Sequence, residues 1–203
     1  MDELPMTVDL LKLITNDVQG NIEEIGESEI FQGETITGEG TLNFKNGNHY
    51  KGDLSRGLMD GKGLFKWPDG VLYEGTFELN KLTGSGKYTW EDNSYYHGQI
   101  KDALRDGSGV FKSTKGGVEY EGGWKEGLKH GKGKIVYKSG AIYEGEFQFG
   151  FKHGEGKMTY PSGNYYIGSY KFDKKSGYGE MTWATRGEEY QGFWENDLQN
   201  GFG

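Results

Sequence analysis

The chain has 203 residues, of which 37 are Gly and 30 are aromatic, and it contains no Cys. Gly makes up about 18 % of the chain, against roughly 7 % in ordinary proteins. Ala, the strongest helix former, occurs only three times, so a helical domain is disfavoured. The absence of Cys excludes disulfide scaffolds, Cys-based zinc sites and thiol nucleophiles, and it suits a reducing compartment.

Charge is unevenly distributed along the chain. Residues 1–30 carry eight acids and one base, a balance of −7, whereas residues 31–203 carry 23 acids and 22 bases, which completes the net −8. All the aromatic residues lie from Phe31 onward. We therefore predict an acidic N-terminal segment at 1–30 and a second region at 31–203. Because phosphate contacts need a basic surplus, we expect no nucleic-acid partner.

The acidic segment allows several interpretations. Residues 7–14 fit a short helix with Thr7 as its N-cap, whose Leu10, Leu11 and Ile14 would cover a sheet edge, and they fit a disordered acidic tail equally well. Residues 18–22 have the spacing of a degenerate capping strand. No apolar run approaches the ~20 residues of a membrane span. Acidic residues stand where a signal peptide would be basic, so secretion is not expected.

Two motifs recur in phase from residue 31 onward. Tyr-x-Gly begins at Tyr50, Tyr73, Tyr96, Tyr120, Tyr143, Tyr166 and Tyr190, in steps of 23 or 24 residues. Gly-x-Gly begins at Gly38, Gly61, Gly84, Gly107, Gly131, Gly154, Gly177 and Gly201, with the same steps. A period of this length indicates a repeat architecture. The first unit, Phe31-Gln-Gly33, is shortened by four residues, as is common for a terminal cap.

The position of the extra residues locates the loops. Each 24-residue step gains its residue between Gly-x-Gly and the next Tyr, at residues 113–117 and 184–187. The equivalent stretches elsewhere contain Asn46-Gly47, Asp69-Gly70, Ser139-Gly140 and Ser162-Gly163, which are hairpin turn signals. A turn can absorb one residue, whereas a strand would exchange its two faces. We therefore predict turns at these positions.

Each unit predicts two short strands with one aromatic and one charged face. The strands read Tyr-x-Gly-x-Φ and Gly-x-Gly-x-Φ-x-Φ, where Φ is apolar, and residues two apart share a face. The glycines share the aromatic face, where a ring can lie over bare backbone and a Cβ would collide with it. These structural glycines are Gly61, Gly63, Gly84, Gly86, Gly107, Gly109, Gly131, Gly133, Gly154, Gly156, Gly177 and Gly179. We expect Gly131→Val to overpack this face, and Lys129→Ala, predicted to lie on a turn, to cost little.

The combined pattern resembles the MORN repeat (membrane occupation and recognition nexus) over residues 31–203. The resemblance implies an all-β fold, an elongated single twisted antiparallel sheet of successive hairpins with about eight units, the last of which is incomplete. Because the last Gly-x-Gly is not followed by an apolar strand, its hairpin is expected to lack a return strand, and we expect further repeats or a partner strand to complete it.

Some stretches resemble the MORN arrays of radial spoke head proteins of motile cilia in particular. They are Arg-Gly-Leu-Met-Asp-Gly-Lys-Gly at 56–63, Trp-Pro-Asp-Gly at 67–70, and the run from Glu189 to Gly203. This resemblance implies a scaffold in the cytoskeleton of the cilium axoneme. It also implies a multi-protein complex with other radial spoke head proteins or axonemal proteins.

The residues that could carry chemistry do not form a site. His130 and His153 share a repeat position and would lie roughly 10 Å apart, too far to bind one zinc ion. Glu74, Glu121 and Glu144 recur after the repeated Tyr, which is typical of solvated or cross-strand paired positions. Gly-x-Gly is followed by neither Gly-Lys-Ser/Thr nor a helix, so a phosphate-binding loop is disfavoured. We expect no enzymatic activity, no metal and no cofactor.

Recognition is the function that remains. A single sheet has no second layer to cover its aromatic face, and a large exposed apolar surface marks an interaction site. We interpret the repeated Tyr mainly as packing between hairpins. The candidate protein-binding rings are Trp67, Phe77, Trp90, Trp124, Phe147, Tyr160, Tyr170, Trp183 and Trp194.

The alternative is a MORN targeting module that binds phospholipid or membrane-associated partners and is attached to a catalytic or other domain outside this chain. Lys87, Lys134 and Lys157 share a repeat position that would face a lipid surface, but Leu64, Val110 and Glu180 interrupt the series. An anionic membrane attracts clustered Lys and Arg, each contributing about 1 kcal/mol. We therefore expect protein binding rather than lipid binding.

Overall fold

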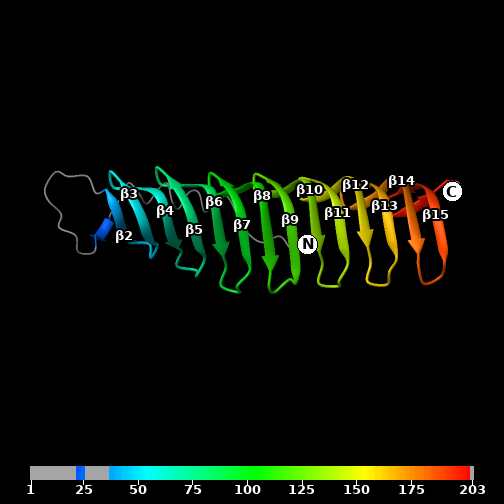
Figure 1. Cartoon of the computed structure of the whole chain (residues 1–203), viewed down its shortest axis with the longest axis horizontal. Coiled ribbons are helices and arrows are strands. Elements are labelled where there is room, and N and C mark those ends of the chain that lie inside the picture. The colour runs from blue at the N-terminus through cyan, green and yellow to red at the C-terminus, as the bar shows by residue number, and fades with distance from the viewer. Residues whose placement is uncertain (1–21, 26–36, 202–203) are drawn as a thin grey trace. The chain divides into compact units, whose positions relative to one another are not determined.

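The computed structural model describes residues 22–25 and 37–201, and every regular element in this part of the chain is a β-strand (Figure 1). The chain divides into two compact units, Met1–Asp106 and Gly107–Gly203. Within each unit, strand order follows chain order and neighbouring strands are antiparallel. The predicted all-β fold of successive hairpins is confirmed.

The strands alternate between the two sequence motifs. The first unit contains β1 (Ile22–Ile25), β2 (Gly38–Phe44), β3 (His49–Ser55), β4 (Leu58–Lys66), β5 (Leu72–Glu78), β6 (Lys81–Thr89), β7 (Tyr95–Lys101) and the start of β8 (Leu104–Ser113). The second contains the rest of β8, β9 (Val118–Lys125), β10 (Leu128–Val136), β11 (Ile142–Gln148), β12 (Phe151–Thr159), β13 (Tyr165–Lys171), β14 (Lys174–Trp183), β15 (Glu188–Glu195) and β16 (Leu198–Asn200).

A short strand lies at the start of the first unit. β1 pairs with β2, with Ile22 opposite Phe44 and Ile25 opposite Leu42. A strand thus occupies the capping position, although it begins at the last residue of the segment predicted for it. The candidate helix at 7–14 and the shortened Phe31 unit lie outside the described residues. The boundary near residue 30 stays a prediction.

The predicted turns between Gly-x-Gly strands and the following Tyr strands are confirmed. The N–H of Trp67 donates to the carbonyl of Val71 at 2.9 Å, and the N–H of Gly70 donates to the carbonyl of Trp67 at 3.0 Å. In the longer loop at 113–117, the N–H of Gly117 donates to the carbonyl of Ser113 at 2.9 Å. Both 24-residue steps therefore place their extra residue in a loop, and the strand faces are kept.

A second set of turns joins each Tyr strand to its Gly-x-Gly strand, and the turn expected at Lys129 lies instead at Glu126 and Gly127. Two residues form each turn, and both have left-handed φ, as at Leu79 (+47°) and Asn80 (+68°). This is the pattern of a type I′ turn. The returning strands therefore begin three residues before Gly-x-Gly. β16 pairs with β15 in this way, so the prediction of a last hairpin without a return strand is wrong.

The repeated Tyr rings cover cross-strand pairs of glycines. Gly133 pairs with Gly122, and a Cβ on Gly133 would lie 2.5 Å from the Tyr120 Oη. The hydroxyl of Tyr120 donates to the carbonyl of Gly123 at 2.8 Å. A Cβ at the second glycine of Gly-x-Gly would meet a Tyr ring in the same way at Gly63, Gly86, Gly156 and Gly179.

The first glycine of Gly-x-Gly has a different role. Gly131 has φ of +70°, and a Cβ there would meet nothing within 4 Å. The expected overpacking of Gly131→Val is therefore wrong, because the constraint at this position lies in the backbone. The pairing of β10 with β9 shifts between Lys129 and Gly133, and such a bulge bends the strand. The part of the hairpin between this bulge and the tight turn therefore bends out of the plane of the rest of the strand pair.

Rings at the fifth position of the Tyr strand connect consecutive repeats. Phe147 lies edge-on to Tyr143 of its own repeat and to Tyr120 of the preceding one, with centroid distances of 5.2 and 5.1 Å. The same arrangement links Phe77 to Tyr73 and Tyr50, Tyr170 to Tyr166 and Tyr143, and Trp194 to Tyr190 and Tyr166. These rings are the core of each unit.

Candidate interaction surfaces

The nine predicted binding rings fall into two groups. Six are buried, because they pack between the repeats: Trp67, Phe77, Trp124, Phe147, Tyr170 and Trp194. Three are half-buried and keep solvent-accessible surface: Trp90, Tyr160 and Trp183. The aromatic face was expected to be widely exposed. In the described residues it is largely covered, because the bends at the bulges fold the outer part of each hairpin across it.

The three half-buried rings share one position, the end of a Gly-x-Gly strand just before its loop. The backbone there is held by the loop: the N–H of Tyr160 donates to the carbonyl of Asn164 at 2.8 Å. Burial raises the pKa of the Tyr160 hydroxyl. Trp90 stacks beside Tyr88, with ring centroids 6.1 Å apart. Each of the three rings is therefore only partly covered.

Three lysines in the second unit place their ammonium groups over pairs of core rings. Lys152 Nζ lies 5.7 Å from the Tyr143 centroid and 5.3 Å from that of Tyr170. Lys129 covers Tyr120 and Phe147, and Lys175 covers Tyr166 and Trp194. Burial lowers the pKa of Lys152 and of Lys175.

These cation–π contacts were not among the expectations from the sequence. Lys129 lies in β10 rather than on a turn, so the reason given for a harmless Lys129→Ala is wrong. The available signal was a Lys nine residues after the repeated Tyr in three consecutive units. The first unit has Met59, Leu82 and Arg105 at this position, and the guanidinium of Arg105 lies 6.0 Å from the centroid of Tyr96.

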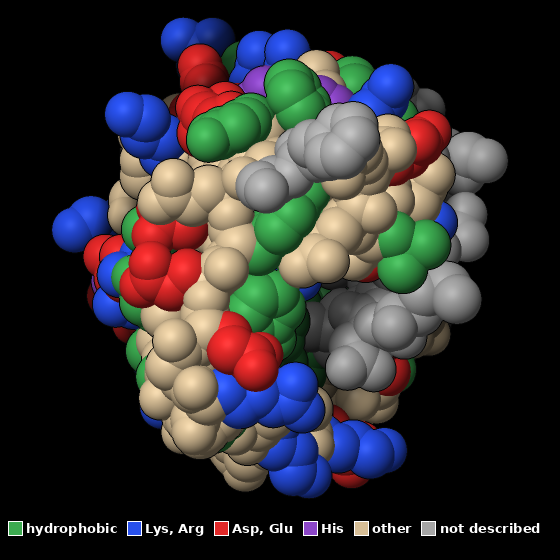
Figure 2. Space-filling model, turned by 90° about the vertical axis from the view of Figure 1, so that its right-hand side faces the viewer, with side chains coloured by type: hydrophobic (Ala, Val, Ile, Leu, Met, Phe, Trp, Pro, Cys, Tyr) green, Lys and Arg blue, Asp and Glu red, His purple; other side chains and the backbone are tan. Residues whose placement is uncertain are grey.

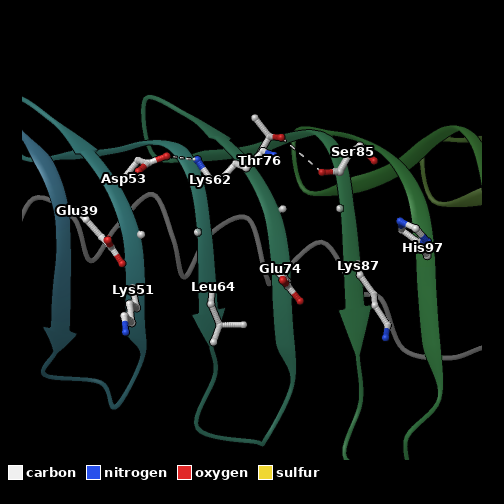
Figure 3. Close-up of a pocket in the computed structure, with 14 residues that line it drawn as sticks. Glu39, Lys51, Asp53, Lys62, Leu64, Glu74, Thr76, Ser85, Lys87 and His97 are labelled. Atoms are coloured by element: carbon white, nitrogen blue, oxygen red, sulfur yellow. Dashed lines mark hydrogen bonds between the residues drawn. The ribbon is translucent and has the colours of Figure 1, made fainter.

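The charged face of the first unit forms a shallow cavity of about 710 Å³ (Figure 3). Acidic and basic side chains alternate across its strands, among them Lys51, Glu74 and Lys87. Asp53 accepts a hydrogen bond from the N–H of Lys62 at 2.8 Å. Glycines from neighbouring strands, Gly52, Gly63, Gly75 and Gly86, are among its lining residues.

Exposed apolar side chains gather at the hairpin tips of the second unit. Leu128, Phe149, Phe151 and Phe172 are 47, 60, 43 and 53 % exposed. We call these four residues the tip ridge. The rings of Phe151 and Phe172 lie 5.9 Å apart, and His153 lies 5.4 Å from Phe172. Figure 2 shows hydrophobic side chains beside His and several Lys or Arg side chains along the upper edge of the end that it views.

Across residues 22–25 and 37–201, no three His, Asp or Glu side chains gather closely enough to bind a metal ion. In this same part of the chain, no helix has the length and apolarity to cross a membrane.

Some solved structures are similar to this chain. One is the TCP domain of Drosophila melanogaster SAS-4 in complex with a proline-rich motif of Ana2, at 14 % identity and a TM-score of 0.46, covering 88 % of this chain and 100 % of that one. The TCP10 domain of Danio rerio CPAP, in complex with a peptide of STIL, has 13 % identity and a TM-score of 0.38, covering 79 % and 82 %. With TM-scores below 0.5, these likenesses carry no argument about partners.

A comparison with curated proteins found no match. A family model described as MORN repeat matches residues 50–71, 73–95, 96–118, 120–142, 143–165, 166–188 and 190–203. Each match begins at a repeated Tyr and spans the Gly-x-Gly strand and loop that follow it, apart from the shorter last one. Because these matches cover more than half of its length, the chain belongs to the MORN-repeat family.

Proposed function

We propose that this chain is a non-enzymatic scaffold that binds other proteins in the head of a ciliary radial spoke. Its partners are other radial spoke head proteins or axonemal proteins, and its location is the cytoskeleton of the axoneme. The MORN repeats support a protein-interaction module. The similarity of residues 56–63, 67–70 and 189–203 to the N-terminal MORN array of radial spoke head protein 10 homologue B supports the placement in the spoke head.

The half-buried rings Trp90, Tyr160 and Trp183 carry the proposal of protein binding. Their backbones are held by loop hydrogen bonds and their rings are half-buried, so little conformational freedom is lost on binding. Large rings with a polar tip are enriched among residues that dominate interface energies. We therefore assign these three rings as the first contacts to test.

The test is recovery of radial spoke head proteins with the tagged full-length protein from motile ciliated cells. Trp183→Ala and Tyr160→Ala are expected to lower recovery by about tenfold or more, which corresponds to the loss of an interfacial ring. The control is Glu189→Ala, because Glu189 is an exposed side chain on β15. Thermal melting of each variant checks that the fold is kept.

Two results would contradict the proposal. One is recovery without any radial spoke head or axonemal protein. The other is flotation of the protein with phosphoinositide liposomes together with unchanged protein recovery in the ring variants, which would favour the lipid-binding alternative.

A further inference from the structure

The tip ridge has no role in the repeat itself. Phe149 and Phe172 occupy the first position of their two-residue turns, where Leu79 stands in one other hairpin and Arg56, Asp102, Glu126 and Asn196 stand in the rest. Their φ values are +50° and +48°, a conformation that bulky residues rarely adopt. Two exposed phenylalanines thus stand where backbone conformation disfavours them. Folding does not account for this choice.

The ridge is continuous across consecutive hairpins. The N–H of Gly150, in the turn that carries Phe149, donates to the carbonyl of Lys129 in β10 at 2.9 Å. The N–H of Asp173, beside Phe172, donates to the carbonyl of Lys152 in β12 at 3.0 Å. Each turn therefore rests against the strand that begins with the previous ridge residue, Leu128 or Phe151.

The rings are also held in place by their neighbours. Phe151 and Phe172 meet edge-on, with an interplanar angle of 82°. The imidazoles of His130 and His153 pack against Phe149 and Phe172, respectively. A preorganised apolar surface loses little conformational entropy when a partner covers it.

Unpaired positive charge borders the ridge. Lys171 and Lys174 face each other across β13 and β14, and Lys125 faces Leu128 across β9 and β10. Like charges directly opposite in a ladder are unfavourable. No carboxylate of the described residues lies within 4.0 Å of these three ammonium groups. Glu195 is nearby, but its carboxylate accepts a hydrogen bond from Asn200 at 3.0 Å.

A recess of about 370 Å³ lies where the charge and the ridge meet. Phe172 lines it together with Lys171, Lys174 and Ser176, and Glu195 and Asn196 complete it. An apolar side chain that enters this recess would lie against the Phe172 ring. A carboxylate beside it on the same segment would lie near two lysines.

We propose that the tip ridge binds an acidic segment of a partner protein that carries bulky apolar side chains. The apolar side chains pack against Phe149, Phe151 and Phe172, and the carboxylates pair with Lys171, Lys174 and Lys125. A second copy of this chain would bring lysines against lysines. A flat anionic membrane would meet the acidic Glu126 and Glu195 at the same edge, whereas a short segment can place its carboxylates at the lysines alone. The proposal rests on the proposed function only in that the chain binds proteins, and it does not require the radial spoke.

The experiment selects displayed random peptides on the intact protein and measures the enriched peptides by fluorescence anisotropy. Enriched sequences are expected to combine Asp or Glu with Leu, Ile, Phe or Trp. Phe172→Asn is expected to weaken their binding by about tenfold or more, because a central apolar anchor is lost. Asn tolerates the left-handed φ of this turn, so the fold is kept. Lys174→Glu is expected to weaken binding and to reduce its salt dependence.

Matched controls lie elsewhere on the second unit. Phe193→Ser removes another exposed ring, which packs on Tyr178 and lies outside the ridge, and Lys132→Glu reverses another exposed lysine. Both are expected to leave peptide binding unchanged. Trp183→Ala, which tests the radial spoke proposal, is also expected to leave it unchanged, so the two proposals can fail separately.

Several outcomes would overturn the proposal. They are the absence of any enriched peptide, enrichment of basic or purely polar peptides, and equal binding to Phe172→Asn. Phe172-dependent binding to phosphatidylserine vesicles without peptide binding would assign the ridge to a membrane instead. A dimer that is lost in Phe172→Asn, again without peptide binding, would assign it to a second copy of the chain.

Discussion

The ring of Tyr120 lies over Gly133 so closely that a Cβ on this glycine would be 2.5 Å from the phenolic oxygen. The same hydroxyl donates a hydrogen bond to the carbonyl of Gly123 at 2.8 Å, which fixes the ring over the backbone. Tyr-x-Gly and Gly-x-Gly are therefore two halves of one packing unit. A change in either half affects the other.

Gly133→Ala is expected to destabilise the second unit by about 1–3 kcal/mol, because the new methyl group must displace a buried ring. Chemical denaturation followed by circular dichroism measures the change. In the double variant Tyr120→Leu with Gly133→Ala, the alanine should cost less than it does alone. Equal costs in the two backgrounds would show that the ring does not set the constraint.

At Gly131 the melting temperatures of variants should depend on backbone strain rather than on side-chain volume. Asn is tolerated at the φ of +70°, whereas Val is strained there. Gly131→Asn should therefore melt close to the unmodified protein, and Gly131→Val clearly below it. If a Cβ clash governed this position, both variants would be destabilised to a similar extent.

Substitution of Lys152 tests how much the ammonium group over the core rings contributes to stability. Lys152→Ala is expected to cost about 1–2 kcal/mol through loss of the buried stem and of the cation–π contact with Tyr143 and Tyr170. Lys152→Met keeps an unbranched stem and reproduces the residue found at Met59, so it should cost less. Denaturant midpoints of the two variants give the comparison. If Lys152→Met destabilised the protein as much as Lys152→Ala does, the apolar stem of Lys152 would contribute nothing to stability.

Stability should fall in alkaline solution as the covered tyrosines ionise. Burial raises the pKa of Tyr50, Tyr73, Tyr96 and Tyr166 to about 12 in the folded state. Because an unfolded tyrosine titrates near pH 10, the unfolded state releases its protons first. The stabilisation is full below about pH 10 and is lost as the pH rises from there through about 12.

Tyrosinate absorbance and circular dichroism, recorded in one alkaline titration, measure this effect. Ionisation of the covered rings should coincide with unfolding. In Tyr73→Phe one ionisable ring is gone, so stability should depend less steeply on pH over this interval. Complete ionisation of the tyrosines in a folded protein would contradict the assignment.

Much of the fold could be predicted because it depends on short-range periodicity. The spacing of Tyr143, Gly145 and Phe147 placed these residues on one face of one strand, and the extra residue in 113–117 located a loop. The positions of the tight turns were missed because residues such as Leu79 and Phe172 give no turn signal. The left-handed conformation there is imposed by pairing of the flanking strands.

The candidate rings were harder to predict, for a related reason. A period of two identifies the face of Phe147 but does not reveal what covers that face. The covering comes from the register shift beside Gly131. This shift is a property of hydrogen bonding between strands, and its only trace in the sequence is the extra glycine of Gly-x-Gly. From the sequence alone, the lysines over the rings, such as Lys152, look like ordinary surface charges. Only the bend of the strand that carries them shows that they lie over the rings.

The fifth-position rings impose a rule on how such a gene can change in length. Phe147 meets the Tyr of its own repeat and that of the preceding repeat at nearly the same distance, and Tyr170 does the same one period later. Removing or duplicating one whole period therefore rejoins equivalent junctions, whereas a break within a period leaves a ring without its second partner. Recombination between repeats is therefore expected to preserve these ring contacts when it adds or removes whole periods.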